Sequence, residues 1–546
     1  MIGMKKIINL LILGCLISCF FIGSFTSCKN ETDLVLPRLF RPIGFNVSTN
    51  KTVATFSWAA VDSAVSYSLK VSNDSLNFKN LVIDTTLTNL FYVKELAGST
   101  KFFARIYANA KDTTKNSKFN TLSFKTPAEN IFSGYGTNTN TGKLYSAYMT
   151  APKTLDIKWT PGANVTNLVL SSADGATSNS YVISSSEVAA GEKIISQLAN
   201  SNWTVKIYNN TILRGTATGL VEGDIILKAG DDLPTTITNA VAGQVILLPA
   251  GAVFPMGTST YSLGKNIKVR GLSVTNRPVI CPSTGASSSS SPLGLTNAID
   301  YVRFENIDFT GYCNNTVGNK VGYLINNSVA TTVKSLSFMN CNMHNFGNTP
   351  MRLQGSKNQV VDTLTFNGCV INEFGFGSGY ALVNISKSTD YINNVVIANS
   401  TIYNFSYPVI SVVQTTATTM NSVTISNCTF NQTSQNTTAA RVLFNFDFVT
   451  LTKGITISNC VFGSSGSLTS GVKITNVAQP IVPTITGSYY TSDFVDATLV
   501  GAYPIKASMT AYSGASTALW NSPTTGDFTF KDSAFKGKGV AGDLRW

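Results

Sequence analysis

Charged residues are scarce in this sequence. Asp, Glu, Lys and Arg make up only 12% of the 546 residues, about half of the usual share. Long helical patterns rich in Glu, Lys and Ala are also missing, while Ser, Thr and Asn are abundant. These absences argue against a cytosolic helical enzyme. They favour β-rich extracellular domains, and a chain of this length is expected to hold several of them.

The positive charges form no stripe along the chain. The formal net charge is +12, and about +10 remains if an N-terminal segment containing Lys5 and Lys6 is removed, a modest bias towards acidic partners. Charges scattered in this way argue against nucleic acid as a partner.

Histidine is represented by His344 alone, and the cysteines of the repeat region are not grouped in closely spaced pairs. Zinc sites require Cys or His ligands in such pairs. We therefore predict no metal site of this kind. Disulfide bonds remain compatible with a secreted chain.

The N-terminal segment carries the one long apolar run. MIGMKK supplies positive charge, IINLLILGCLISCFFIGSF is apolar, and FTSC ends at Cys28. This pattern predicts a secretory signal peptide over residues 1–28. The small residues before Cys28 resemble the bacterial lipobox, which implies cleavage there and acylation of Cys28, and the following KNETD loosely resembles the surface-export signal of Bacteroidetes lipoproteins. We expect a lipoprotein anchored in the outer membrane and exposed at the cell surface; the alternative is an uncleaved membrane anchor.

Residues 37–126 alternate polar and apolar residues as in a β-sandwich, and Trp58 and Tyr67 fall where a sandwich buries large aromatic side chains. The Trp, the Y-x-L-x-V strand and the L-x-x-x-T-x-x-x-x-R-x-x-A run from Leu96 to Ala108 resemble a fibronectin type III module. Such modules usually serve as spacers or docking units. Residues 131–220 again show short alternating strands and predict a second, fibronectin-like sandwich.

Between residues 221 and 480 a short strand motif recurs. The repeats are RFENIDF, SFMNCNM, TFNGCVI, VIANSTI, TISNCTF and TISNCVF, and their first core residues, from Phe304 to Ile457, follow at spacings of 34, 28, 31, 28 and 32 residues. One strand motif per repeat of this length indicates a solenoid. We predict a right-handed parallel β-helix, so that the chain is all-β: N-terminal β-sandwich modules followed by the β-helix.

The Asn of each motif is predicted to turn the chain between two strands. Asn tolerates left-handed backbone angles and bonds the local backbone, and Gly368 takes its place in the third repeat. The stacked set is Asn306, Asn340, Asn399, Asn427 and Asn459. The next position forms an inward column of Ile307, Cys341, Cys369, Ser400, Cys428 and Cys460. Buried thiols are favoured over disulfides, which need strict geometry; the states of Cys281 and Cys313 stay open.

Phe346, Phe374 and Phe405 follow the motif in three successive repeats. A stack of aromatic rings on the surface binds the faces of sugars, whereas a stack inside a corner belongs to the core. The core interpretation is favoured.

The repeat region resembles the pectate-lyase-like superfamily, which includes polysaccharide lyases and pectin-type hydrolases; GQVILLPAGAVF (243–254) resembles its opening coil. The resemblance implies an acidic polysaccharide as ligand, although a fold does not fix function. Polygalacturonase-type hydrolases use clustered Asp residues and a Gly-His-Gly, and that motif set is missing here. Lyases of this fold usually use a Lys or Arg base, and calcium is expected as a cofactor only in that case.

Two groups of charged residues are candidates for facing a glycan. The first comprises Arg352, Lys357, Lys387, His344 and Glu373. The second comprises Lys268, Arg270, Arg303, Glu305 and Asp308. The alternatives are solvated charges on unrelated loops for the first group and a surface salt-bridge ladder for the second. Neither group identifies a catalytic base.

From residue 481 the chain leaves the repeat and is expected to form a β-rich cap. Its GDLRW ending resembles that of uncharacterised Bacteroidetes β-helix lipoproteins, and Trp546 is expected to pack on the last coil, because solenoid ends need caps. The leading hypothesis is a monomeric surface lipoprotein whose β-helix binds a complex acidic polysaccharide, with lyase-type cleavage as an open extension. The alternative is a non-catalytic adhesin or structural surface protein.

Overall fold

The computed structural model describes residues 38–546 apart from 133–145, 284, 313–319, 377–379, 388, 406–407, 433–442, 466–471, 476–480 and 496–501. The predicted signal peptide with Cys28, and also Cys313, lie outside the described residues. No helix in the described part of the chain is long and apolar enough to cross a membrane. The chain divides into two compact units, residues 1–129 and 130–546.

The first unit is an antiparallel β-sandwich. One sheet has the order β1 (Asn46–Asn50), β2 (Val53–Ser57), β5 (Phe91–Glu95), and the other has the order β4 (Leu81–Leu87), β3 (Ser66–Ser72), β6 (Lys101–Asn109), β7 (Asn120–Lys125). Every second residue of β6 is buried, because successive side chains of a strand point to opposite faces. The ring of Trp58 lies 5.6 Å from that of Tyr67 in this core, as the sequence predicted.

A second antiparallel sandwich opens the second unit. One sheet has the order β11 (Ser178–Val182), β10 (Asn167–Ser172), β13 (Ser201–Asn209), β14 (Ile212–Val221), and the other has the order β12 (Glu192–Ile195), β9 (Thr154–Lys158), β8 (Ala147–Ala151). Trp159 and Trp203 are its largest buried side chains. The short helix α2 (Ser185–Ala190) begins with a capping box between Ser184 and Glu187, which satisfies free backbone donors at its start.

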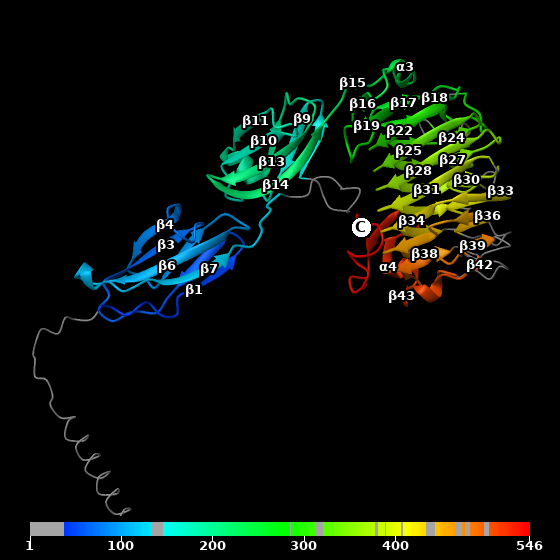
Figure 1. Ribbon diagram of the computed structural model, residues 1–546. Coiled ribbons are helices and arrows are strands. Elements are labelled where there is room, and N and C mark those ends of the chain that lie inside the picture. Colours follow the sequence, from blue (N-terminus) through cyan, green and yellow to red (C-terminus); the bar gives the residue numbers. More distant parts are fainter. Residues whose placement is uncertain are drawn as a thin grey trace, which may run out of the picture. The chain divides into compact units, whose positions relative to one another are not determined.

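Three sheets stacked coil upon coil form the solenoid, and Figure 1 shows its strands stacked in parallel rows. Sheet 1 contains β15 (Ile225–Ile226), β16 (Val245–Leu248), β19 (Ile267–Gly271), β22 (Asn297–Glu305), β25 (Thr331–Met339), β28 (Gln359–Asn367), β31 (Tyr391–Ala398), β34 (Ser422–Ser426), β37 (Ile455–Ser458) and β40 (Thr484–Thr486). Sheet 2 contains β17 (Val253–Pro255), β20 (Val279–Cys281), β23 (Asp308–Thr310), β26 (Asn342–His344), β29 (Val370–Phe374), β32 (Thr401–Phe405), β35 (Thr429–Gln432), β38 (Val461–Ser465), β41 (Tyr489–Tyr490) and β43 (Thr510–Ala511).

Sheet 3 completes each coil. It contains β18 (Tyr261–Leu263), β21 (Leu293–Leu295), β24 (Tyr323–Asn327), β27 (Thr349–Leu353), β30 (Val383–Ile385), β33 (Ile410–Met420), β36 (Phe444–Leu451), β39 (Val472–Thr475) and β42 (Ala502–Tyr503). Neighbouring strands pair in parallel except β39 with β42. The helix α3 (Leu233–Asn239) lies at the first coil (Figure 1) and buries Leu233 and Ile237 in the solenoid core. The predicted order of sandwiches followed by a parallel β-solenoid is confirmed.

The asparagine corner lies between sheets 1 and 2, as predicted. The five stacked asparagines have φ between 48° and 57°, and Gly368 has φ 70°, so each occupies the left-handed region. Side-chain amides bond from coil to coil: Asn340 Nδ2 donates to Asn306 Oδ1 at 2.7 Å, and Asn427 Nδ2 to Asn399 Oδ1 at 3.4 Å. Gly368 has no side-chain amide. Asn399 Nδ2 therefore donates to Oδ1 of Asn367, the residue before Gly368, at 3.0 Å.

The cysteine column faces the interior. Cys341, Cys369, Cys428 and Cys460 are free thiols with no exposed surface, which confirms the prediction of buried thiols. Each Sγ donates to backbone carbonyls, as Cys369 Sγ does to the Phe338 carbonyl at 3.3 Å. Cys281, by contrast, is disulfide-bonded.

The aromatic column that follows the motif is also internal. Phe346, Phe374 and Phe405 are at most 1% exposed, and the rings of Phe374 and Phe405 stack with centres 5.4 Å apart. The favoured interpretation, a core ladder, is confirmed. These rings are therefore not a sugar-binding surface.

The C-terminal segment returns along sheet 2. It contains α4 (Ser516–Leu519), β44 (Trp520–Ser522) and β45 (Asp527–Phe530), and Figure 1 shows its end, in red, beside the solenoid rather than across its last coil. Asp543 Oδ2 accepts from Thr401 Oγ1 at 2.7 Å, and the Asp543 amide donates to Thr429 Oγ1 at 3.0 Å. Arg545 Nη2 donates to the Gly368 carbonyl at 2.6 Å. These contacts reach three successive coils.

Trp546 does not pack on the last coil, so that prediction was wrong. Its Nε1 donates to Thr401 Oγ1 of β32 at 2.8 Å, and its ring lies 6.0 Å from that of Phe528. The reason is that the chain folds back over the outer side of sheet 2 after its last solenoid strands, which the sequence pattern does not reveal.

Candidate functional site

Sheet 3 carries a row of polar side chains on its outward face. Met351 and Leu353 of β27 are buried in the core, so Arg352 between them points outward. Strand register places the corresponding residues of neighbouring coils in one line. This outward row consists of Asn326, Arg352, Asn384, Ser411 and Asn445. Since coils are spaced by roughly 4.8 Å, the row offers a hydrogen-bonding side chain at each step.

Two tyrosines hold the guanidinium of Arg352. Its Nη1 donates to the Tyr323 hydroxyl at 3.2 Å, and its Cζ lies 4.4 Å from the centre of the Tyr380 ring and 5.7 Å from that of Tyr323. At such distances the ring faces attract the cation. The charge of Arg352 is therefore held in a defined position on the outward row.

Three buried polar atoms of the outward row have no hydrogen-bond partner among the described residues: Arg352 Nε, Asn326 Oδ1 and Asn445 Oδ1. Asn445 uses its Nδ2 to donate to Ser411 Oγ at 3.5 Å. Nearly all buried polar groups in proteins are hydrogen-bonded. A ligand lying along the row is one source of the missing partners.

Lys357 and Lys387 lie beyond the outward row, in the turns that follow β27 and β30, and both are exposed. The buried carboxylate of Asp390 fixes the first turn, since it accepts from the backbone amides of Ser356, Lys357 and Gln359 at 2.9–3.2 Å. The two lysines therefore stand at the edge of this face, not within the row.

His344 and Glu373 lie on another face, at the ends of β26 and β29 in sheet 2. His344 Nε2 lies 2.9 Å from Oδ1 of Asp308, a residue predicted with the second group, and His344 Nδ1 lies 2.7 Å from Asn345 Nδ2. Glu373 has φ 53°, an uncommon conformation for Glu. The five residues predicted to share one groove are thus divided between sheet 3, its turns and sheet 2.

Four residues of the second group do come together. Lys268 and Arg270 of β19 stand opposite Arg303 and Glu305 of β22, and Glu222 from the end of the second sandwich joins them. Glu222 Oε1 accepts from Lys268 Nζ and, at 2.8 Å, from Arg270 Nη1; Glu305 Oε2 lies 3.1 Å from Lys268 Nζ and 3.5 Å from Arg303 Nη2. We call these five residues the junction network. It is an ion-pair ladder, but Arg270 is only 3% exposed, so the ladder, apart from the half-buried Arg303, is buried between sandwich and solenoid.

The junction network shifts the pKa values of Glu305 and Arg270. Burial alone would raise the pKa of Glu305, but the charges of Arg270, Lys268 and Arg303 lower it from 4.5 to about 2. Burial alone would lower the pKa of Arg270, but attraction to Glu305, Tyr148 and Glu222 raises it above its ordinary value. Both groups are therefore charged at neutral pH.

Tyr148 links the network to the asparagine corner. Its ring centre lies 5.0 Å from Arg270 Cζ, and its hydroxyl accepts from Asn306 Nδ2. Around it is a cavity of about 270 Å³, lined by Ala147, Tyr148, Met149, Asn202, Thr218, Gly219, Leu220, Lys268, Arg270, Arg303 and Glu305. The cavity has one cationic wall from the solenoid and one largely apolar wall from the sandwich.

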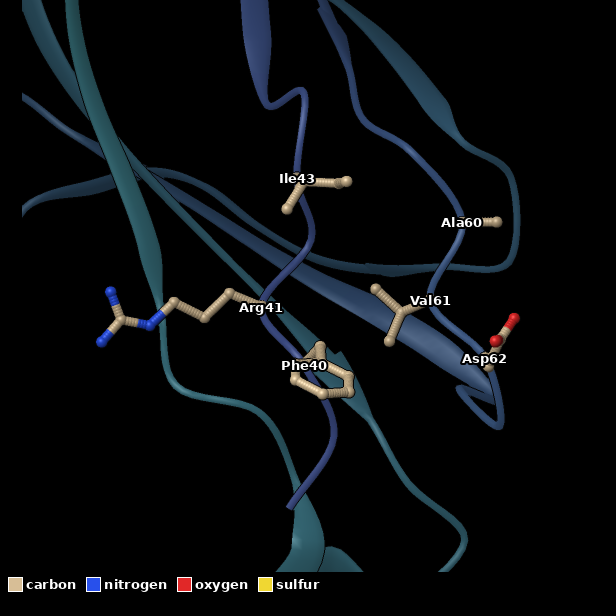
Figure 2. Close-up of a pocket in the computed structure, with 6 residues that line it drawn as sticks. All are labelled: Phe40, Arg41, Ile43, Ala60, Val61 and Asp62. Carbon is tan, nitrogen blue, oxygen red and sulfur yellow. The ribbon is translucent and has the colours of Figure 1, made fainter. Parts of the chain in front are cut away.

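A larger cavity, of about 580 Å³, lies in the first unit (Figure 2) and is lined by Phe40, Arg41, Ile43, Ala60, Val61 and Asp62. Figure 2 shows the guanidinium of Arg41 and the carboxylate of Asp62 pointing to opposite sides. Phe40 is 85% exposed. The cavity thus brings no set of polar groups together, and we assign no ligand to it.

In the described residues no group of three or more His, Cys, Asp and Glu side chains is arranged to hold a metal ion. Sequence reasoning missed Tyr323, Tyr380, Tyr148 and Glu222. A signal for the first two exists, since VGYLIN (321–326) and SGYALV (378–383) both carry a Gly-Tyr pair, at the start of β24 and shortly before β30 of sheet 3. Tyr148 and Glu222 act from another domain, and no local pattern marks them.

A family model described as a domain of unknown function (DUF5123) matches residues 423–546. This range includes the later coils and the C-terminal segment that packs on sheet 2. No curated protein matches the sequence.

Solved structures similar to this chain include fibronectin type III proteins. The structure described as FN3tt mut is 22% identical, with a TM-score of 0.15, over 16% of this chain and 98% of its own. A two-domain fibronectin type III segment from chicken tenascin is 15% identical, with a TM-score of 0.16, over 33% and 98%. The FN1–FN3 domains of chicken CNTN1 are 14% identical, with a TM-score of 0.15, over 34% and 67%.

Proposed function

We propose that the solenoid binds an acidic polysaccharide along the outward row of sheet 3, with Arg352 recognising a carboxylate. The observation that carries this proposal is the position of Arg352. Its guanidinium is held by Tyr323 and Tyr380, and its Nε has no partner among the described residues.

The chemistry of the row suits a glycan. A guanidinium binds a carboxylate through two parallel N–H donors, and Nη1 alone is used by Tyr323. The amides of Asn326, Asn384 and Asn445 both donate and accept, as hydroxyl-rich ligands require. A row that repeats with every coil matches an extended ligand made of repeating units.

Export of the chain is part of the proposal. The N-terminal apolar segment ending at Cys28 supports a lipid anchor in the outer membrane, and the disulfide of Cys281 supports an oxidising compartment. Along the chain, the two sandwiches lie between this proposed anchor and the solenoid.

The test measures binding of the full-length protein to polygalacturonate, alginate and a glycosaminoglycan by isothermal titration calorimetry, with dextran as neutral glycan. Arg352→Met keeps the apolar stem of the side chain but removes the charge. We expect at least a tenfold loss of affinity for one acidic glycan, because charge-assisted hydrogen bonds contribute about 1.5–3 kcal/mol.

Lys334→Met is the matched control, since Lys334 is exposed on sheet 1 and pairs with Asp300. It should leave affinity unchanged. Equal losses in both variants would show attraction to net charge alone, and no binding of any acidic glycan would refute the proposal. Near-ultraviolet absorbance with calcium present separates the remaining alternatives, because a lyase creates an unsaturated uronate whereas an adhesin leaves the glycan intact.

A further inference from the structure

We propose that the cavity at the junction network is a second binding site, for a small organic monoanion bearing a carboxylate, such as a single sugar acid. It lies between β8, β13 and β14 of the second sandwich and β19 and β22 of the solenoid. This site is separate from the outward row of sheet 3 and does not depend on the function proposed there.

The charges of the network favour an anion. Three cations, Lys268, Arg270 and Arg303, face two carboxylates, Glu222 and Glu305. One positive charge is therefore left without a counter-charge inside the network. A monoanion neutralises it, whereas a cation adds to the repulsion in a setting where little water screens the charges.

The donors of the network are not all used. Nε of Arg270 and Nε of Arg303 are buried and have no hydrogen-bond partner among the described residues. Arg270 itself is 3% exposed and lines the cavity. Buried donors of this kind are normally bonded, and a carboxylate lined up against a guanidinium supplies two acceptors at once.

The cavity is accessible from solvent and has an apolar wall in addition to the cationic one. The Arg303 side chain is 40% exposed, so one cation of the site reaches solvent. Ala147, Met149 and Leu220 provide apolar surface, and Asn202 and Thr218 provide hydrogen-bonding groups at the rim. A volume of about 270 Å³ lies just below the range of about 300–1,000 Å³ of drug-sized ligands. A molecule no larger than a monosaccharide is therefore the expected occupant.

The test uses isothermal titration calorimetry of the full-length protein with galacturonate and glucuronate, with acetate as a carboxylate that lacks the sugar ring, inorganic phosphate as another anion, and glucose as the neutral sugar. We expect saturable binding of a sugar acid and none of glucose. Arg303→Met removes the accessible cation without touching buried Arg270 and should weaken binding at least tenfold.

Two further variants separate binding from folding. Leu220→Trp fills the cavity without changing charge and should abolish binding, while Arg352→Met, in the separate row of sheet 3, should not affect it. Tighter binding of phosphate than of either sugar acid would overturn the assignment to a carboxylate. No saturable binding of any probe, or binding unchanged in Arg303→Met and Leu220→Trp, would show that the network serves only as an ion-pair clamp.

Discussion

Glu305→Gln tests the junction network in its structural role. Glutamine keeps the shape of the side chain but removes the charge that Lys268, Arg270 and Arg303 face. Removing one partner of a buried ion pair leaves the others without compensation, which is strongly destabilising. We therefore expect the variant to fold but to open more readily around β19 and β22.

The magnitude follows from the pKa. Lowering the pKa of Glu305 from 4.5 to about 2 corresponds to about 3 kcal/mol of stability, because one pKa unit is worth about 1.4 kcal/mol. Since the folded-state pKa is the lower one, this stability is fully present above pH 4.5. It is lost as the pH falls from about 4.5 to about 2.

Hydrogen–deuterium exchange, measured on individual peptides, reports the local stability of β19 and β22. A local measurement is needed because a chain with several domains has no single free energy of unfolding. Amides of β19 and β22 should exchange on the order of 100-fold faster in Glu305→Gln at pH 7, as about 3 kcal/mol implies. In the native protein, protection of these strands should fall towards pH 2. The variant should lack that decrease.

Asp300→Asn is the matched control on the same strand. Asp300 pairs with Lys334, but both side chains are more than half exposed, and exposed pairs contribute little. Its exchange should stay close to that of the native protein. If Glu305→Gln behaved like Asp300→Asn, the network would not stabilise the junction and the reasoning from burial would be wrong.

Three further predictions concern the solenoid. Phe366→Ala should destabilise it by about 3–5 kcal/mol in urea unfolding, since Phe366 is fully buried and stacks on Phe338 at 5.3 Å; Phe376→Ala, at a 37% exposed position, should have little effect. Asn399→Gly should be less harmful than Asn399→Ala in the same assay, because φ is 48°, which glycine adopts without strain and alanine does not; equal losses would contradict the corner assignment. The four thiols of the cysteine column should not react with a thiol reagent at pH 8 until the protein unfolds, because none of them is exposed and burial raises the pKa of Cys341, Cys369 and Cys428, that of Cys369 to about 11; rapid reaction of these thiols in the native protein would show that the column is open.

Much of the solenoid could be predicted from its repeat. The Asn-Cys motif predicts where the chain turns and which side chain points inward, because both properties are local. Asn340 adopts the left-handed angles of the corner, and the next residue, Cys341, is buried in the core. Each coil then constrains the next through parallel register. The motif thus predicted the core column and the corner together.

The candidate sites were harder to predict, because a repeat does not say which of three faces a residue beyond the motif occupies. Arg352 and His344 are eight positions apart, yet the corner between them puts one on sheet 3 and the other on sheet 2. The junction network depends on Glu222 and Tyr148, which reach the solenoid from a neighbouring sandwich. Contacts between domains leave no periodic trace in a sequence.

The C-terminal segment changes how the solenoid can come apart. In a simple repeat array each coil contacts only its neighbours, so the last coils can detach one at a time. Here residues 543–545 bond Gly368, Thr401 and Thr429 across three coils. These hydrogen bonds must break before the coils can detach from the end, and they distribute a pulling force over several coils. The C-terminal segment thus couples these coils, so that they are expected to unfold cooperatively rather than one at a time.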